Sequence, residues 1–390
     1  MIRSRRGLLF LALLAGGARA LPAQERFISD ARTVLTPSFV SWKFADALTQ
    51  DSIDVGRVSQ IAFPVSVSFE SARWTVDVGG AVARGWVRTA DGRDLDLAGL
   101  TDIRVRAVGR IVGDQLLVTA GLNVPTGKTA LSRRQLDVLR VLATPALGMP
   151  VPSLGLGMGG TAGLVYAMSA GEWGVAFGSS VEIRGSYSPV EARLAGAAAP
   201  TDLRPGPAVR FSFGADRLVG AGKFSLLVAA DIYGKDRLSL DQPGGAVEGT
   251  YQLGPQFSAT AYLDLAPRGM ERLGFTVADR YRSRFAGIDG RKVAGSSGNY
   301  LMAAADGAVA VGRAASVFAR LEGRLDGGLE VDQTITTAAA NLATLTLGLT
   351  LRSGRATVEP FASIGGGRLD AGPAESSVSG FGAGLTVTIR

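Results

Sequence analysis

The chain has 390 residues and a formal net charge of +7, and it contains neither histidine nor cysteine. The lack of cysteine excludes disulfides and thiol chemistry, and the lack of histidine removes the commonest metal ligand and the commonest general base. Four arginines in the first 20 residues account for part of the charge and leave +3 for the rest, and no block of lysine and arginine indicates a nucleic-acid partner.

Residues 1–20 have the three parts of a secretory signal peptide. A basic stretch is followed by an apolar run over residues 8–15 and by a small-residue cleavage signal that ends at Ala20. The apolar run is well short of the ~20 residues that a transmembrane helix needs. We therefore expect export, with cleavage after Ala20 or three residues later. A short periplasmic segment over 21–32 then precedes the folded unit, 33–390.

From residue 33 onward, apolar and polar residues alternate in sixteen segments. Successive side chains of a strand point to opposite faces, so each segment predicts a strand with one apolar and one polar face. Many segments exceed the ~5–6 residues of an ordinary strand and reach the ~9–11 that a membrane strand needs. The predicted strands are 33–44, 57–70, 72–87, 101–112, 115–124, 156–168, 172–187, 207–218, 222–235, 248–266, 271–286, 297–311, 315–328, 339–352, 355–367 and 378–390.

This pattern predicts an all-β fold, a transmembrane antiparallel outer-membrane β-barrel of sixteen strands with its apolar faces toward lipid. Short turns, such as Gly113-Asp114, alternate along the chain with longer connections, as periplasmic turns and extracellular loops do in such barrels. Fourteen strands are the alternative, if 33–44 lies inside the lumen or 355–367 is unpaired. The longer connections are 45–56, 88–100, 125–155, 188–206, 236–247, 287–296, 329–338 and 368–377.

Two tryptophans have the spacing that a membrane strand requires, whereas one acidic residue falls on the face predicted to contact lipid. Trp74 and Trp86 share a face twelve residues apart, which is ~30 Å vertically on a tilted strand and matches the distance between two interfaces. Asp279 falls on the outward face between Val277 and Tyr281. We expect a bulge or a change of register there, because a carboxylate in hydrocarbon is unfavourable.

Charged residues gather on the predicted inner face. They either brace the wall through salt bridges or contact the solute, and the excess of arginine favours an interior that tolerates anions. The lumen residues expected along the pathway are Arg104, Arg106, Arg110, Arg280, Arg282, Arg320, Glu322 and Arg324.

The longest connection, 125–155, contains the best predicted helix. Ser132 and Gln135 have the spacing of a capping box, and Pro145 ends the helix. An apolar stripe exposed on an extracellular loop is unfavourable, so we expect the loop to fold inward and narrow the pore. It forms either a purely structural constriction or an apolar vestibule for a solute. The helix stripe is Leu136, Leu139, Leu142 and Ala143, and Leu147 and Met149 follow it in the constriction.

The run GLTDIRVRAVGRIVGDQLLVTAGLNVPTGKTAL resembles the phenol meta-pathway (MetA-like) outer-membrane transporters, which are related to the FadL fatty-acid channels. The pattern begins at Gly99-Leu100-Thr101-Asp102 and ends, after two strands, at Pro125-Thr126-Gly127. The resemblance covers roughly residues 60–190 and implies uptake of small hydrophobic or aromatic compounds. The few residues before the first strand are too short for the N-terminal hatch of the fatty-acid channels.

The sequence therefore favours a passive outer-membrane channel for small apolar or aromatic solutes. A general-diffusion porin and a non-conducting structural or adhesive barrel are the alternatives. We expect no enzymatic activity, no cofactor and no bound metal. The expected partners are outer-membrane lipid, the solute and the barrel-assembly machinery, while the transported compound and the oligomeric state stay open.

Overall fold

The computed structural model describes residues 31–390 except 51–52, 113–114, 190–198, 243–244, 288–289, 294, 332–333, 338 and 372–373. The predicted signal peptide and nearly all of the segment 21–32 lie outside the described residues. Within the described ranges, no helix has the length and hydropathy that crossing a membrane requires.

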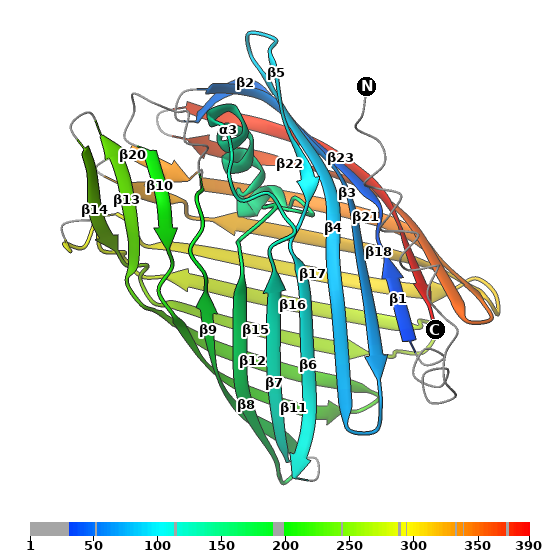
Figure 1. The fold of residues 1–390 in the computed structure, drawn as a ribbon. Helices are drawn as coiled ribbons and strands as arrows, with labels where there is room; N and C mark the ends of the chain where they lie inside the picture. The colour runs from blue at the N-terminus through cyan, green and yellow to red at the C-terminus, as the bar shows by residue number, and fades with distance from the viewer. Residues whose placement is uncertain are drawn as a thin grey trace, which may run out of the picture.

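Sixteen antiparallel strands close into a barrel (Figure 1), as the sequence predicts. Each pairs with its neighbours along the chain, and β23 pairs with β2, which closes the ring. The wall strands are β2 (Ser38–Gln50), β3 (Ile53–Glu70), β4 (Trp74–Thr89), β6 (Ile103–Val112), β7 (Leu116–Val124), β8 (Gly159–Ala170), β9 (Trp173–Arg184), β11 (Ala208–Val219), β12 (Gly222–Tyr233), β15 (Gln256–Leu265), β16 (Arg272–Arg282), β17 (Gly298–Ala310), β18 (Ala315–Asp326), β21 (Ala339–Ser353), β22 (Ala356–Ala371) and β23 (Ala374–Ile389).

Two short strands complete the wall. β1 (Ala31–Leu35) precedes β2 and lies between β23 and β3, and β5 (Asp94–Leu100) precedes β6 and pairs with the upper part of β4. The fourteen-strand alternative is wrong, because β2 and β22 are each paired on both sides.

The outer face of the barrel is apolar. Many large hydrophobic side chains of the outward parity are at least 37% exposed, which is unfavourable in water but suits contact with lipid. The alternation that the sequence shows is therefore an outward apolar belt around an inner face of polar, charged and small residues. Representative outward residues are Phe63, Leu164, Phe177, Phe257, Leu321, Leu347 and Phe381.

Several predicted long connections are more regular than expected, because backbone groups that leave the wall still pair with one another. The connection 45–56 is mostly hairpin, since β2 and β3 extend almost to its tip. Segment 248–266 is not one strand, because its first part belongs to a separate sheet and the wall strand starts at Gln256. That three-stranded sheet comprises β10 (Ala199–Arg204), β13 (Asp236–Gln242) and β14 (Gly245–Tyr251), and β19 (Leu329–Val331) pairs with β20 (Thr334–Thr337).

The bulge expected at Asp279 is wrong. The register runs through this residue without a shift, and Asp279 pairs with Ala259 on one side and Leu301 on the other. Its carboxylate shares the outward face with Val277 and Tyr281, and its Oδ1 has no hydrogen-bond partner among the described residues. Asp279 lies three residues from the end of β16, and the ends of membrane strands lie near an interface, where an acidic residue costs much less than at the midplane.

Candidate functional site

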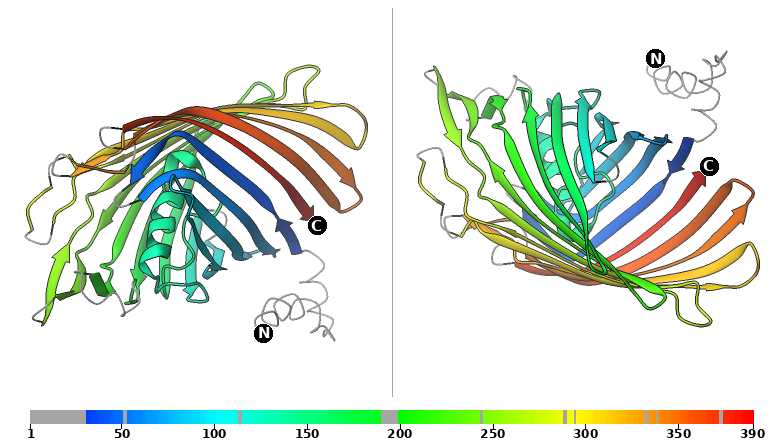
Figure 2. Two further views of the ribbon diagram at one scale, coloured as in Figure 1. Left: turned by 90° about the horizontal axis from the view of Figure 1, so that it is seen from above. Right: turned by 90° about the horizontal axis from the view of Figure 1, so that it is seen from below.

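The connection between β7 and β8 lies inside the ring (Figure 2) and carries α3 (Arg133–Leu142) and the short helix η1 (Pro145–Leu147). The predicted capping box is formed. Ser132 Oγ accepts the Gln135 N–H at 3.4 Å, and Gln135 Oε1 accepts the Ser132 N–H at 3.2 Å. The local sequence thus starts the helix, while the contacts described next hold it in the lumen.

Both ends of this loop are tied to the Asp102 carboxylate. Oδ1 accepts the Gly127 N–H at 2.9 Å, and Oδ2 accepts the Leu156 N–H and the Asn123 side-chain amide, both at 2.7 Å. The Asp102 N–H donates to the Leu154 carbonyl at 3.0 Å. We call these five residues the loop anchor. A side chain at position 127 would overlap the Leu154 carbonyl, so this position requires glycine.

Two threonine side chains form hydrogen bonds with backbone groups of the wall where the loop anchor interrupts the strand ladder. Residues 101–102 separate β5 from β6 and leave backbone groups without ladder partners. Thr101 Oγ1 accepts the Ala81 N–H at 2.7 Å, and Thr126 Oγ1 accepts the Ile103 N–H at 3.0 Å and donates to the Thr101 carbonyl at 2.9 Å. The residues behind the family resemblance therefore have a structural task, which is to hold the loop at mid-wall.

The helix packs on the inner faces of β3, β4 and β5. Leu142 lies directly on Gly85, where a Cβ would overlap the leucine side chain, and Val138 and Val141 are fully buried. The buried face of the helix is therefore rotated about the helix axis relative to the predicted stripe. Leu142 is buried as expected, Leu136 and Leu139 are only partly buried, and Ala143 is exposed. Leu139 and Leu142 lie between the strands, at Ala83, Gly85 and Leu97, and the segment 147–154 that returns from the helix, at Val151 and Leu154.

The segment 147–154, which returns from the helix toward β8, contacts the wall at Trp42 of β2 and at Gln60 of β3. Leu147 and Met149 are buried, and the Leu147 carbonyl accepts the Trp42 indole N–H at 2.9 Å. The Gln60 amide makes two hydrogen bonds with the Val151 backbone, at 2.6 and 2.9 Å. The sequence reasoning missed Trp42 and Gln60. Their inward parity is the signal that was available, together with the glycines at 365 and 380 on which the Trp42 ring rests.

The predicted lumen charges on β16 and β18 are engaged in contacts. Glu322 accepts hydrogen bonds from Arg320 at 2.7 Å and from Arg324 at 2.5 Å, and Arg324 also donates to the Ala146 carbonyl of the loop at 3.0 Å. The Arg280 guanidinium lies 5.1 Å from the centre of the Tyr300 ring. The Arg282 guanidinium donates to Gln256 Oε1 at 3.3 Å. These residues brace the wall and the loop.

Arg104 and Arg106 are arranged differently. Both are exposed on the inner face of β6, and no hydrogen bond or ion pair to either is found among the described residues. The strand registers put Glu182 and Arg184 of β9 level with them, across β7 and β8. Arg110 lies near the turn at the other end of β6 and does not join this group. A cavity of about 390 Å³ is lined by Arg104, Arg106, Gly121, Asn123, Gly159, Thr161, Glu182 and Arg184.

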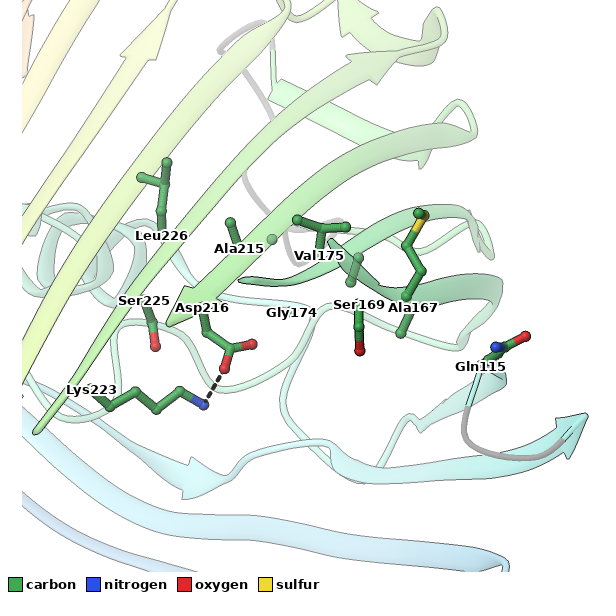
Figure 3. Close-up of a pocket in the computed structure, with 13 residues that line it drawn as sticks. Gln115, Ala167, Ser169, Gly174, Val175, Ala215, Asp216, Lys223, Ser225 and Leu226 are labelled. Atoms are coloured by element: carbon green, nitrogen blue, oxygen red, sulfur yellow. Dashed lines mark ion pairs between the residues drawn. The ribbon is translucent and has the colours of Figure 1, made fainter. Parts of the chain in front are cut away.

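A second cavity, of about 470 Å³, continues along the same wall toward the short turns. Small inward residues of β8, β9 and β11 leave this space, and Lys223 Nζ lies 3.0 Å from Asp216 Oδ2 at its edge (Figure 3). We call the inner faces of β6, β7, β8, β9, β11 and β12 the open side. The inner faces of β21, β22, β23, β2, β3, β4 and β5, with the loop on them, are the packed side. Residues lining the second cavity include Ala167, Ser169, Gly174, Ala176, Gly214 and Ser225.

Two titratable groups outside the wall strands have shifted pKa values. The Arg352 guanidinium binds the Glu271 carboxylate through two hydrogen bonds, at 3.2 and 3.1 Å, and lowers its pKa. Burial raises the pKa of the Tyr251 phenol, and the neighbouring Asp236 carboxylate adds to the shift. In the part of the chain that the structure describes, no group of three or more Asp or Glu could hold a metal ion.

No protein-family model matches the sequence, and no curated protein matches it. Among solved structures, a deltaS2 mutant of the TodX monoaromatic hydrocarbon channel aligns with a TM-score of 0.47 and 10% identity, over 93% of this chain and 90% of that one. The CymD monoaromatic hydrocarbon channel gives 0.43 and 11%, over 93% and 88%. An anion-selective porin from Comamonas acidovorans gives 0.39 and 12%, over 92% and 98%. Structural similarity at such low TM-scores and identities does not indicate which solute this chain binds.

Proposed function

We propose that this chain is an outer-membrane channel for passive uptake of small hydrophobic or aromatic compounds, without an enzymatic step. The observation that carries the proposal is the divided lumen. The loop and its apolar contacts fill the packed side, while small residues leave two cavities in succession on the open side. A solute that enters past the loop therefore meets two separate sites along one wall.

The dimensions and the chemistry of this path suit a single aromatic ring. The cavities of about 390 and 470 Å³ fall within the ~300–1,000 Å³ range of small-molecule sites. Glycine and alanine backbone forms flat apolar surface between the charged groups, and a planar ring can lie on it. The resemblance of residues 99–127 to the MetA-like transporters, relatives of the FadL channels, supports the same class of solute.

A general-diffusion porin is the second candidate, and the charged groups of the open side favour it. Pairs such as Lys223–Asp216 and Arg210–Asp231 keep water in the lumen and suit hydrated solutes. The extent of the packed side favours the third candidate, a non-conducting barrel.

Uptake into vesicles with a lipopolysaccharide outer leaflet separates the three candidates. We expect radiolabelled benzyl alcohol to enter vesicles that contain the chain faster than arabinose does, relative to vesicles without it. Equal acceleration of both solutes would indicate a general-diffusion porin, and acceleration of neither would indicate a non-conducting barrel.

A matched pair of variants on β8 ties the uptake to the open side. Ala167 faces the second cavity, so Ala167→Phe should slow benzyl alcohol entry several-fold. Ala162 is exposed on the outer face of the same strand, and Ala162→Phe should leave the rate unchanged. Equal rates in the two variants would place the path elsewhere.

A further inference from the structure

The arginines of the upper cavity differ from the other arginines of the lumen. Arg210 binds Asp231 at 2.6 Å, and Arg324 binds Glu322 at 2.5 Å. Arg104 and Arg106 are exposed to the lumen, and neither has an ion pair or a hydrogen bond within the described ranges. Two adjacent cationic side chains thus face the same cavity without an ion pair, although Asp77 of β4 lies opposite Arg106 in the register, where its carboxylate accepts a hydrogen bond from Ser68.

Two buried polar atoms on the same cavity also lack partners. Arg184 Nε has no hydrogen-bond acceptor among the described residues, and its nearest carboxylate oxygen, Glu182 Oε1, is 3.7 Å away. Asn123 Oδ1 has no donor, because the Asn123 amide nitrogen is turned toward Asp102 Oδ2 and the Gly157 carbonyl. A buried polar atom without a partner is unfavourable, so each of these two side chains would gain a hydrogen bond by turning toward a polar ligand in the cavity.

Two glycines, Gly121 and Gly159, lie in the floor between the two charged groups; the Thr161 hydroxyl covers Gly121, so Gly159 is the open glycine floor. Gly121 lies between Arg106 and Thr161 in the ladder, and Gly159 lies between Asn123 and Arg184. From β6 to β9 there are three strand spacings, about 14 Å at the backbone. Side chains from both edges and one single-ring molecule fill that width. We call this surface, formed by Arg104, Arg106, Gly121, Gly159, Glu182 and Arg184, the arginine groove.

We propose that the arginine groove binds small aromatic monocarboxylates, a specificity that rests on the proposed channel function and narrows it. The carboxylate accepts hydrogen bonds from Arg104 and Arg106, whose planar guanidinium groups match its two oxygens. The ring lies on the glycine floor and points toward Arg184. Glu182 disfavours a second negative charge on the ring, so dianions bind more weakly.

Isothermal titration of the detergent-solubilised full chain with benzoate and with benzamide tests the proposal, because the two differ in charge but hardly in shape. We expect benzoate to bind about tenfold tighter or more, as a charge-assisted pair requires. The double variant Arg104→Gln/Arg106→Gln should lose that difference and keep its benzamide affinity. Arg268→Gln, which removes an exposed cation from the short turn between β15 and β16, should bind both ligands as the unaltered chain does.

Three results would overturn the proposal. They are equal affinities of the unaltered chain for benzoate and benzamide, full benzoate affinity in the double variant, and displacement of benzoate by an equal concentration of sulfate. The last would make the groove a site for inorganic anions. Far-ultraviolet circular dichroism and heat-modified gel mobility check that each variant is folded.

The channel function is measured separately, as benzyl alcohol uptake into vesicles. If the groove proposal fails alone, the unaltered chain and the double variant both still admit benzyl alcohol. If the channel proposal fails alone, benzoate still binds in the titration but benzyl alcohol does not enter.

Discussion

The packed side and the open side belong to one continuous wall, yet they differ as a protein core differs from a water-filled channel. On the packed side, large apolar inward residues such as Trp42, Leu342 and Leu369 are at most 4% exposed, and inward glycines of neighbouring strands make room for Trp42. On the open side the inward positions hold glycine, alanine, serine and charged residues. The barrel strands set the diameter, but the inward residues and one loop decide which part of it conducts.

The two sides also differ in how firmly they hold their contents. Burial of a valine or leucine contributes about 1.5–3 kcal/mol, and the loop buries several of these in addition to its anchor hydrogen bonds. On the open side, Arg104 and Arg106 of the groove have no described partner to restrain them. The structure thus combines a fixed constriction with a wall that can adapt to a solute.

Removal of the loop should change the conductance most, because the loop fills the lumen on the packed side. Deletion of 130–150 leaves the anchor intact, since Gly127 and Leu154 already lie side by side. We expect single-channel conductance in a planar bilayer to rise several-fold. Unchanged conductance from a correctly folded deletion protein would place the constriction outside the loop.

Displacing α3 from β4 should have the next largest effect, which is a loss of stability. Gly85→Val places a side chain where Leu142 now packs, and overpacking of this kind costs about 1–3 kcal/mol. Gly80→Val on the same strand is the control, because the nearest atoms to a Cβ there are 3.7 Å away. Urea unfolding in micelles should show a lower midpoint for Gly85→Val only. Equal midpoints would mean that the helix contact adds nothing to stability.

A smaller effect is expected where the loop meets β18. Arg324→Ala removes the hydrogen bond to the Ala146 carbonyl and half of the pairing of Glu322, a loss of about 1–3 kcal/mol. Arg320→Ala removes the other half of that pairing and leaves the loop contact in place. Limited proteolysis should therefore cut the loop faster in Arg324→Ala than in Arg320→Ala. The same cleavage rate in both variants would show that the carbonyl contact does not hold the loop.

The wall could be predicted from sequence because strand alternation is a local pattern. Each predicted segment overlaps one wall strand, although several strands extend further, and the helix start follows from Ser132 and Gln135 alone. The errors came where pairing outside the wall mattered, as in the hairpin of β13 and β14. At Asp279 the general rule against outward charge was applied too strictly for a residue near the interface.

The division of the lumen could not be predicted, because inward parity looks the same on every strand. Arg106 and Arg324 both alternate with apolar residues, but Arg106 pairs with Gly121 while Arg324 pairs with Leu342 and meets the loop. Only the register and the loop path, which join residues up to 178 positions apart, separate an available arginine from an engaged one. Asp102 was noticed as part of a motif, but its role needed the same long-range information.

The smallest expected effect concerns the Glu271–Arg352 pair, which joins the start of β16 to the end of β21, the strand where the packed side begins. The paired guanidinium lowers the folded-state pKa of Glu271 below its value in the unfolded chain, ~4.3. The contribution is therefore complete above that value and is lost as the pH falls through the folded-state pKa. Because the pair is exposed, salt should screen it. The urea midpoint should fall slightly more between pH 6 and pH 3 in the unaltered chain than in Glu271→Gln, and 1 M salt should remove the difference. Parallel pH profiles at low salt would show that the Glu271–Arg352 pair contributes nothing to stability.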